Sequence, residues 1–148
     1  MVLIGAPRTG KTHAATAIGI HAVEHHRKKV RFFSTIEPVN LLEQQKARGK
    51  VRQMADCLLK FDMVILDEPG CLPFSPSGGA LLFHLLCKLY ERTSVVITIN
   101  LSFSEWAGVF CDAKMTTTLL DRLTLHVNIL EMNGDSYRLA QSRARKAG

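Results

Sequence analysis

The 148-residue chain carries 19 Lys and Arg against 13 Asp and Glu, a formal net charge of +6, and 47% of its residues are hydrophobic. This length and balance are typical of one globular domain with a substantial core. No apolar run approaches the roughly 20 residues of a membrane span, and no basic segment leads into an apolar one as in a signal peptide. We therefore expect no membrane partner.

Two further features of the composition bear on location and partners. The four cysteines show no C-x-x-C spacing, which indicates free thiols and a cytoplasmic location. Positive charge gathers before residue 61 and after residue 137, on either side of an acidic centre. This distribution suits a polyanion such as DNA, although an ordinary charged surface explains it as well.

The first motif stands near the start of the chain, after the apolar run 2–4 and before a helix-like stretch. It has the pattern Gly-x-x-x-x-Gly-Lys-Thr and consists of Gly5, Ala6, Pro7, Arg8, Thr9, Gly10, Lys11 and Thr12. Such a loop wraps phosphates with its backbone N–H groups, while the lysine contacts the β and γ oxygens and the Thr hydroxyl contacts Mg²⁺. The motif predicts ATP and Mg²⁺ as cofactors.

Apolar periodicity after this loop predicts alternating helices and strands. We expect strands over 2–4, 30–35, 63–66, 94–99, 125–131 and 136–139. We expect helices over 11–26, 37–48, 51–60, 80–90, 102–110 and 116–123, a loop over 69–79 and a hairpin turn over 133–135. Five of the strands should run parallel with crossovers. The fold class is therefore an α/β P-loop NTPase domain, a three-layer α/β/α sandwich with a mainly parallel five-stranded sheet.

Two acids follow the buried strand over 63–66. Asp67 is expected to hold Mg²⁺ opposite Thr12, and Glu68 to accept the proton of the attacking water. This pair favours hydrolysis over phosphoryl transfer to a small molecule. The alternative is that both acids simply begin a polar loop.

Two later residues could complete the site. Asn100 ends the next strand, where its amide could orient the water or contact the γ-phosphate; a local turn is the alternative. Arg122 could act in trans as an arginine finger, and a salt bridge with a nearby acid explains it equally well.

Six segments in order carry a family resemblance. They are Gly5–Gly19, Met63–Glu68, Gly78–Phe83, Asn100–Trp106, Leu119–Leu123 and Gly134–Arg138. Together they resemble the IstB-type helper ATPases of insertion sequences, relatives of the DnaC helicase loaders in the AAA+ class. The resemblance implies an AAA+ core without a lid domain over 1–139, followed by a basic tail over 140–148. It also implies a self-assembling, DNA-binding ATPase that engages a transposase and holds ATP between subunits.

The resemblance also assigns roles. It places Lys11 and Thr12 in Walker A, Asp67 and Glu68 in Walker B, Asn100 at sensor 1 and Arg122 at the arginine finger. The basic stretch at the following positions is the expected DNA-facing surface: Lys46, Arg48, Lys50 and Arg52. The alternatives are a DnaC-like loader acting on a replicative helicase, a non-hydrolysing nucleotide-binding interaction domain and, more distantly, a small-molecule kinase.

The chain departs from the family pattern in a few places. Arg8 stands where the family often has Gly, Pro69 where Leu or Ile is common, and Ile99 where Thr is common. Family members also carry a substantial segment before the first strand, whereas Gly5 follows Met1 by only four positions. We therefore expect the segment that helps to hold the adenine to be absent from this sequence.

Overall fold

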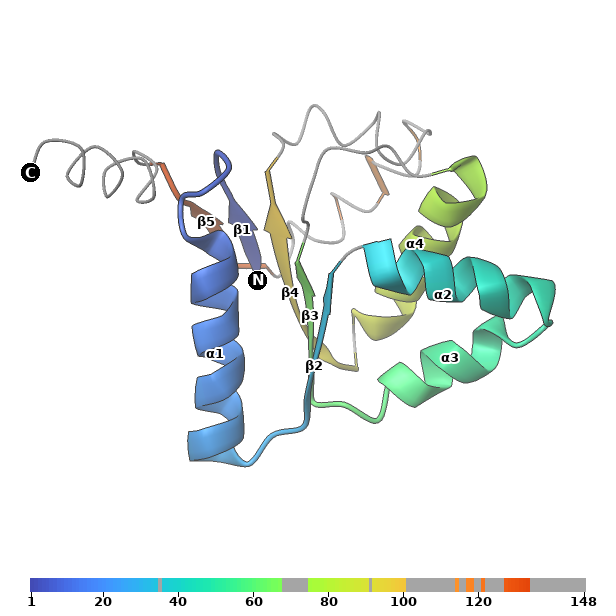
Figure 1. The fold of residues 1–148 in the computed structure, drawn as a ribbon, viewed down its shortest axis with the longest axis horizontal. Helices are drawn as coiled ribbons and strands as arrows, with labels where there is room; N and C mark the ends of the chain where they lie inside the picture. The colour runs from blue at the N-terminus through green and yellow to red at the C-terminus, as the bar shows by residue number, and fades with distance from the viewer. Residues whose placement is uncertain are drawn as a thin grey trace, which may run out of the picture.

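The computed structural model of the chain describes residues 1–34, 36–67, 75–90, 92–100, 114, 117–118, 121 and 127–133. One sheet organises these residues, with every strand pair parallel and the order β2-β3-β4-β1-β5 (Figure 1). The strands are β1 Val2–Ile4, β2 Val30–Ser34, β3 Met63–Asp67, β4 Ser94–Ile99 and β5 Ile129–Glu131. The helices are α1 Lys11–His26, α2 Ile36–Ala47, α3 Val51–Leu58 and α4 Pro76–Leu89.

The helices form a layer on each face of this sheet. Helix α1 lies along one face, and α2, α3 and α4 lie together on the other (Figure 1). Parallel strands require crossover connections, and each face that receives a crossover helix becomes buried. The predicted α/β fold with a parallel five-stranded sheet is therefore confirmed.

Strand alternation divides the core into two clusters. Val64, Leu66 and Ile97 belong to the large cluster shared with α2, α3 and α4. Ile65 and Val96, one position away on the same strands, belong to a small cluster beneath α1. Because successive side chains of a strand point to opposite faces, this division fixes which later residues face α1.

Helix α1 packs closely on the sheet through small residues. Ala15, Gly19 and Ala22 are buried on its inner face. A Cβ atom on Gly19 would lie 2.8 Å from Cδ1 of Ile65, so any larger residue would require the end of the Ile65 side chain to move. The helix ends at His26 and is capped by Arg27, whose backbone adopts a left-handed φ of 52°. The close approach places the first turn of α1 directly beside the ends of the central strands.

The start of α4 differs from the sequence expectation. The loop expected over 69–79 is wrong in its last part, since α4 already begins at Pro76. The Ser75 hydroxyl accepts a hydrogen bond from the Gly78 N–H at 3.0 Å, and proline suits the first helical position. Gly78 is needed for packing because an added Cβ would lie 2.7 Å from Cγ1 of Val39. Tertiary packing thus outweighs the low helix propensity of glycine.

The other boundaries shift little. Strand β5 begins at Ile129, although the sequence predicted a start at residue 125. Of the helix expected over 116–123, the structure describes Thr117, Thr118 and Asp121, all in helical conformation. The expected helix over 102–110, the turn over 133–135 beyond Asn133, the strand over 136–139 and the tail over 140–148 lie outside the described residues. Within the described part of the chain, no helix is long and apolar enough to cross a membrane.

Candidate functional site

The loop Gly5–Thr12 joins β1 to α1 at the carboxyl edge of the sheet. The Gly5 N–H donates to the Ile99 carbonyl at 3.2 Å, and the Met132 N–H donates to the Ile4 carbonyl at 2.7 Å. A Cβ atom on Gly5 would lie only 2.3 Å from the Met132 carbonyl oxygen. Gly5 is therefore required by the close approach of the chain after β5, a neighbour that the sequence did not identify.

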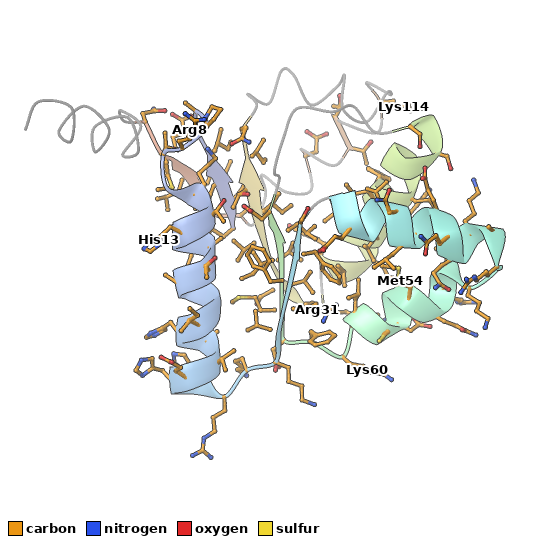
Figure 2. The ribbon with its side chains drawn as sticks, viewed as in Figure 1. Arg8, His13, Arg31, Met54, Lys60 and Lys114 are labelled. Carbon is orange, nitrogen blue, oxygen red and sulfur yellow. The ribbon has the colours of Figure 1, made fainter. Side chains whose placement is uncertain are left out.

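The loop curls through two left-handed residues. Gly10 has a φ of 92° and directly precedes α1, so glycine meets a real conformational need there. Arg8 has a φ of 67°, which is costly for a residue with a Cβ atom. The Arg8 side chain is exposed and lies at the loop end of α1 (Figure 2). Arg8, which stands where the family often has Gly, therefore occupies a position whose backbone conformation favours glycine.

The Lys11 ammonium lies inside the loop. Its side chain belongs to the first turn of α1 and is 5% exposed. Nζ donates to the Gly5 carbonyl at 2.8 Å, to the Ala6 carbonyl at 2.5 Å and to the Thr9 hydroxyl at 3.2 Å. A buried cation at a helix N-terminus is a favourable environment for a phosphate. The Lys11 ammonium and the helix N-terminus therefore suit the phosphates of a nucleoside triphosphate.

Thr12 and Asp67 meet at the end of β3. The Thr12 hydroxyl donates to Oδ1 of Asp67 at 2.9 Å and to Oδ2 at 3.0 Å. The Asp67 side chain is buried, whereas Thr12 is exposed. Hydroxyl and carboxylate oxygens suit Mg²⁺, which is commonly bound by one or two protein ligands together with phosphates and water. The described residues contain no cluster of three or more His, Cys, Asp or Glu side chains able to hold a metal.

A third side chain at this point was not identified from the sequence. Thr98 on β4 is 2% exposed, and its hydroxyl donates to Oδ1 of Asp67 at 2.5 Å. A sequence signal for it existed: Thr98 is a polar residue in an otherwise apolar buried stretch and stands two positions before Asn100. Such an isolated polar residue needs a hydrogen-bond partner, and Asp67 supplies it.

The remaining predicted residues fall into two groups. Asn100 is half-buried and directly follows Ile99. The Ile99 carbonyl accepts a hydrogen bond from the Gly5 N–H, so the backbone at Asn100 lies close to the start of the phosphate loop. Glu68 and Arg122 lie outside the described residues. The structure thus brings together the loop, Asp67 and the end of β4.

The four basic residues form a separate exposed group. Lys46 lies in the last turn of α2, Arg48 and Lys50 lie in the turn between the helices, and Arg52 lies in the first turn of α3. Gly49 makes this turn with a φ of 67°. The group lies on the helical layer opposite α1, at the far end of α2 (Figure 1). One member is anchored, since Lys46 Nζ donates to the Ser77 hydroxyl of α4 at 3.2 Å.

A cavity of about 900 Å³ lies elsewhere, at the amino ends of β3 and β4. Its lining includes Met63, Ser94 and Tyr90 and contains none of the predicted site residues. Phosphate loops and strand-end carboxylates act at the carboxyl edge of a parallel sheet. The chemistry is therefore assigned to the loop end of the molecule despite the size of this cavity.

Comparison with known proteins agrees with this geometry. The profile of the family described as IstB-like ATP binding protein matches residues 1–145. The insertion sequence IS21 putative ATP-binding protein of Pseudomonas aeruginosa is 36% identical over 148 residues, covering 100% of this chain and 55% of that protein. The IS5376 putative ATP-binding protein of Geobacillus stearothermophilus is 34% identical over 143 residues, covering 97% and 57%. The chain thus spans about half the length of these relatives.

Solved structures share the fold at lower identity. The DnaC helicase loader superposes with a TM-score of 0.74 at 21% identity, covering 90% of this chain and 77% of that one. AMPPCP-bound DnaA from Aquifex aeolicus superposes with a TM-score of 0.72 at 16% identity, covering 99% and 45%. These likenesses show that the chain shares the α/β fold of the DnaC helicase loader and DnaA. With the profile match over nearly its whole length, the chain belongs to the family of IstB-like ATP-binding proteins.

Proposed function

We propose that this chain binds ATP with Mg²⁺ at the loop Gly5–Thr12, hydrolyses it to ADP and phosphate, and uses this cycle to assist DNA transposition. The observation that carries the proposal is the contact of the Thr12 hydroxyl with both oxygens of Asp67, at 2.9 and 3.0 Å. This contact joins the first turn of α1 to the end of β3, the two places from which a P-loop enzyme holds its metal.

The site residues then have distinct roles. Lys11 turns its ammonium from the loop carbonyls to the phosphate oxygens, while the N-terminus of α1 and the loop N–H groups face the same charge. Thr12 and Asp67 hold Mg²⁺, which neutralises charge on the phosphates when it is bound. Glu68 accepts the proton of the attacking water, and Asn100 orients that water.

Steady-state ATP hydrolysis with and without duplex DNA tests the enzymatic part. We expect hydrolysis by the wild-type protein, loss of nucleotide binding in Lys11→Ala, and ATP binding without turnover in Glu68→Gln. Lys60→Ala is a matched control because Lys60 is exposed at the opposite end of the sheet (Figure 2). Equal, negligible activity in all proteins, together with absent nucleotide binding, would contradict the proposal.

We further propose that ATP lies between subunits and that Arg122 of one subunit completes the site of the next. An arginine supplied in trans stabilises charge on the transferring phosphoryl group. Arg122→Ala should therefore lower hydrolysis while ATP affinity changes little, and wild-type activity per protein should rise with protein concentration. Activity independent of concentration, with an unaffected Arg122→Ala protein, would contradict a shared site.

The partners follow from the relatives. Names that place homologues in insertion sequences support DNA and a transposase as partners. The likeness to the DnaC helicase loader supports the second candidate, engagement of a replicative helicase. Pull-down of the purified chain with each partner in the presence of ATP distinguishes them: retention of the helicase and not the transposase would overturn the first candidate.

The setting of the protein is also a proposal. We place it in the cytoplasm, with an ATPase core over 1–139 and a basic tail over 140–148. Cys57 is an exposed free thiol, as a reducing compartment allows. Cys71 and Cys111 lie outside the described residues. Limited proteolysis that releases only the tail would support the proposed division.

A further inference from the structure

We propose that Thr98 is a positioning residue for the metal: its hydroxyl fixes Oδ1 of Asp67 so that Oδ2 faces Mg²⁺. The inference rests on the proposed function, since it concerns how that site holds its metal. It adds a residue to which neither the loop motif nor the strand-end acids assign a role.

The sheet fixes Thr98 from both sides. On β1, Leu3 is its register partner. On β3, Leu66 pairs with Ile97, so Asp67 and Thr98 occupy the next positions on adjacent parallel strands. Both follow the alternation of Ile65 and Val96, which face α1. The contact between Thr98 and Asp67 is therefore built into the central strands rather than into a loop.

The two carboxylate oxygens of Asp67 are not equivalent. Oδ1 accepts from the Thr98 hydroxyl at 2.5 Å and from the Thr12 hydroxyl at 2.9 Å. Oδ2 accepts from the Thr12 hydroxyl alone among the described side chains, at 3.0 Å. An ionised carboxylate has about four lone-pair sites, so the more heavily occupied Oδ1 leaves Oδ2 with the greater free capacity. Oδ2 is the oxygen available to a metal or its water.

Thr98 is the more rigid of the two hydroxyl donors. Thr12 is exposed and its oxygen is itself required by Mg²⁺, whereas Thr98 is 2% exposed within β4. A donor that does not touch the metal but orients its ligand typically changes metal affinity by about 10- to 100-fold when removed. Removing the Thr98 hydroxyl should weaken the hold on Mg²⁺ without removing any ligand.

The test measures metal dependence of binding, not turnover. A fluorescent ATP analogue is titrated onto each protein at rising Mg²⁺ and again with EDTA. In Thr98→Val, the Mg²⁺ concentration for half-maximal binding should rise about tenfold or more. Binding in EDTA should stay within about twofold of wild type, because the loop and the helix N-terminus hold the phosphates. Thr98→Ser, which restores the hydroxyl, should return the metal dependence close to that of wild type.

Two further variants separate positioning from simple damage to the core. Thr93→Val is the matched control: Thr93 is 7% exposed, and its hydroxyl donates to the Phe61 carbonyl at 3.3 Å at the other end of the sheet. It should leave the Mg²⁺ dependence unchanged. In an Asp67→Ala background, which removes both oxygens, Thr98→Val should add no further shift, because Thr98 acts through that carboxylate. If Thr98→Val does not fold, Thr98→Cys serves, with an intermediate shift expected from its weak S–H donor.

The outcomes are distinct. A Mg²⁺ dependence in Thr98→Val equal to that of wild type overturns the positioning role, as does Thr98→Ser that is as impaired as the valine variant. An equal shift in Thr93→Val would show a general effect of a buried threonine and also overturn it. Wild-type protein that fails to bind the analogue at any Mg²⁺ concentration would instead overturn the proposed function.

Discussion

Thr12 and Asp67 stand 55 positions apart in the chain, yet the Thr12 hydroxyl lies 2.9 Å from one carboxylate oxygen of Asp67 and 3.0 Å from the other. The parallel sheet creates this proximity because the loop after β1 and the end of β3 open at the same edge. Lys11, buried one position before Thr12, brings a cation to the same place. These three side chains form the centre of the proposed nucleotide site.

Gly5→Ala should destabilise the protein because its Cβ would lie 2.3 Å from the Met132 carbonyl oxygen. Forced overpacking of this kind typically costs about 1–3 kcal/mol in the free energy of unfolding. Urea denaturation measures the change. Gly49→Asn is the control, since nothing lies within 4 Å of that position and asparagine tolerates its φ of 67°. Equal stability of Gly5→Ala and wild type would contradict the close approach of the Met132 backbone.

Arg8 should respond differently to glycine and to alanine. Left-handed backbone costs a residue with a Cβ about 1–2 kcal/mol, and the entropy of glycine offsets about 0.5–1 kcal/mol of this. Arg8→Gly should therefore be between equal in stability to wild type and about 1.5 kcal/mol more stable, whereas Arg8→Ala keeps the backbone strain and should not be stabilised. Both variants remove the same charge, so their ATP affinities should agree. Stabilisation by alanine equal to that by glycine would exclude backbone strain as the cause.

The ion pair between Lys88 and Asp56 should make a small contribution to the free energy of unfolding that is lost at acid pH. A hydrogen bond from Lys88 at 2.6 Å lowers the pKa of the Asp56 carboxyl below its ordinary value of 3.8. The contribution is therefore fully present above the ordinary pKa and is lost as pH falls through the lower folded pKa. The difference in free energy of unfolding between wild type and Asp56→Asn should therefore narrow as pH falls below about 4.

Urea denaturation between pH 6 and pH 3 checks this. Because both side chains are partly exposed to solvent, 1 M salt should shrink the stability difference at pH 6. A stability gap between Asp56→Asn and wild type that is constant across this range would show that the carboxylate charge is not responsible.

The basic group at the turn between α2 and α3 should govern the salt dependence of DNA binding. Replacing Arg48 or Lys50 with Gln should lower the slope of log affinity against log salt by about 0.9 for each lost phosphate contact. Fluorescence anisotropy with duplex DNA measures it. Lys60→Gln is the control, because Lys60 is also exposed but lies after α3, away from this turn (Figure 2). An unchanged slope in the Arg48 and Lys50 variants would contradict phosphate contacts at this turn.

The sequence predicted the central features of the fold because they depend on local patterns. Continuous apolar runs identified β3 and β4 as buried parallel strands, and the glycine pattern located the loop before α1. The P-loop pattern then predicted Asp67, at the end of a buried strand, opposite Thr12, and the structure places the two side chains in contact. The roles assigned to these residues remain predictions, as do those of Glu68 and Arg122.

The features that the sequence missed depend on contacts between distant segments. The early start of α4 was hidden by two glycines, and only the proximity of Val39 explains why Gly78 belongs in a helix. The approach of Met132 to Gly5 joins the two ends of the described chain and has no local signal. Thr98 differs, because its isolated polarity in a buried strand could have indicated a hydrogen bond to the neighbouring strand end.

Calorimetric titration of ATP with Mg²⁺ into wild-type and Lys11→Ala protein tests the central claim most directly. Wild type should bind ATP, and Lys11→Ala should lose at least about tenfold in affinity, because a charge-assisted hydrogen bond contributes about 1.5–3 kcal/mol. Lys28→Ala, an exposed lysine after the far end of α1, should bind as wild type does. No measurable binding to the folded wild-type protein, or equal affinity in Lys11→Ala, would contradict a nucleotide site at this loop.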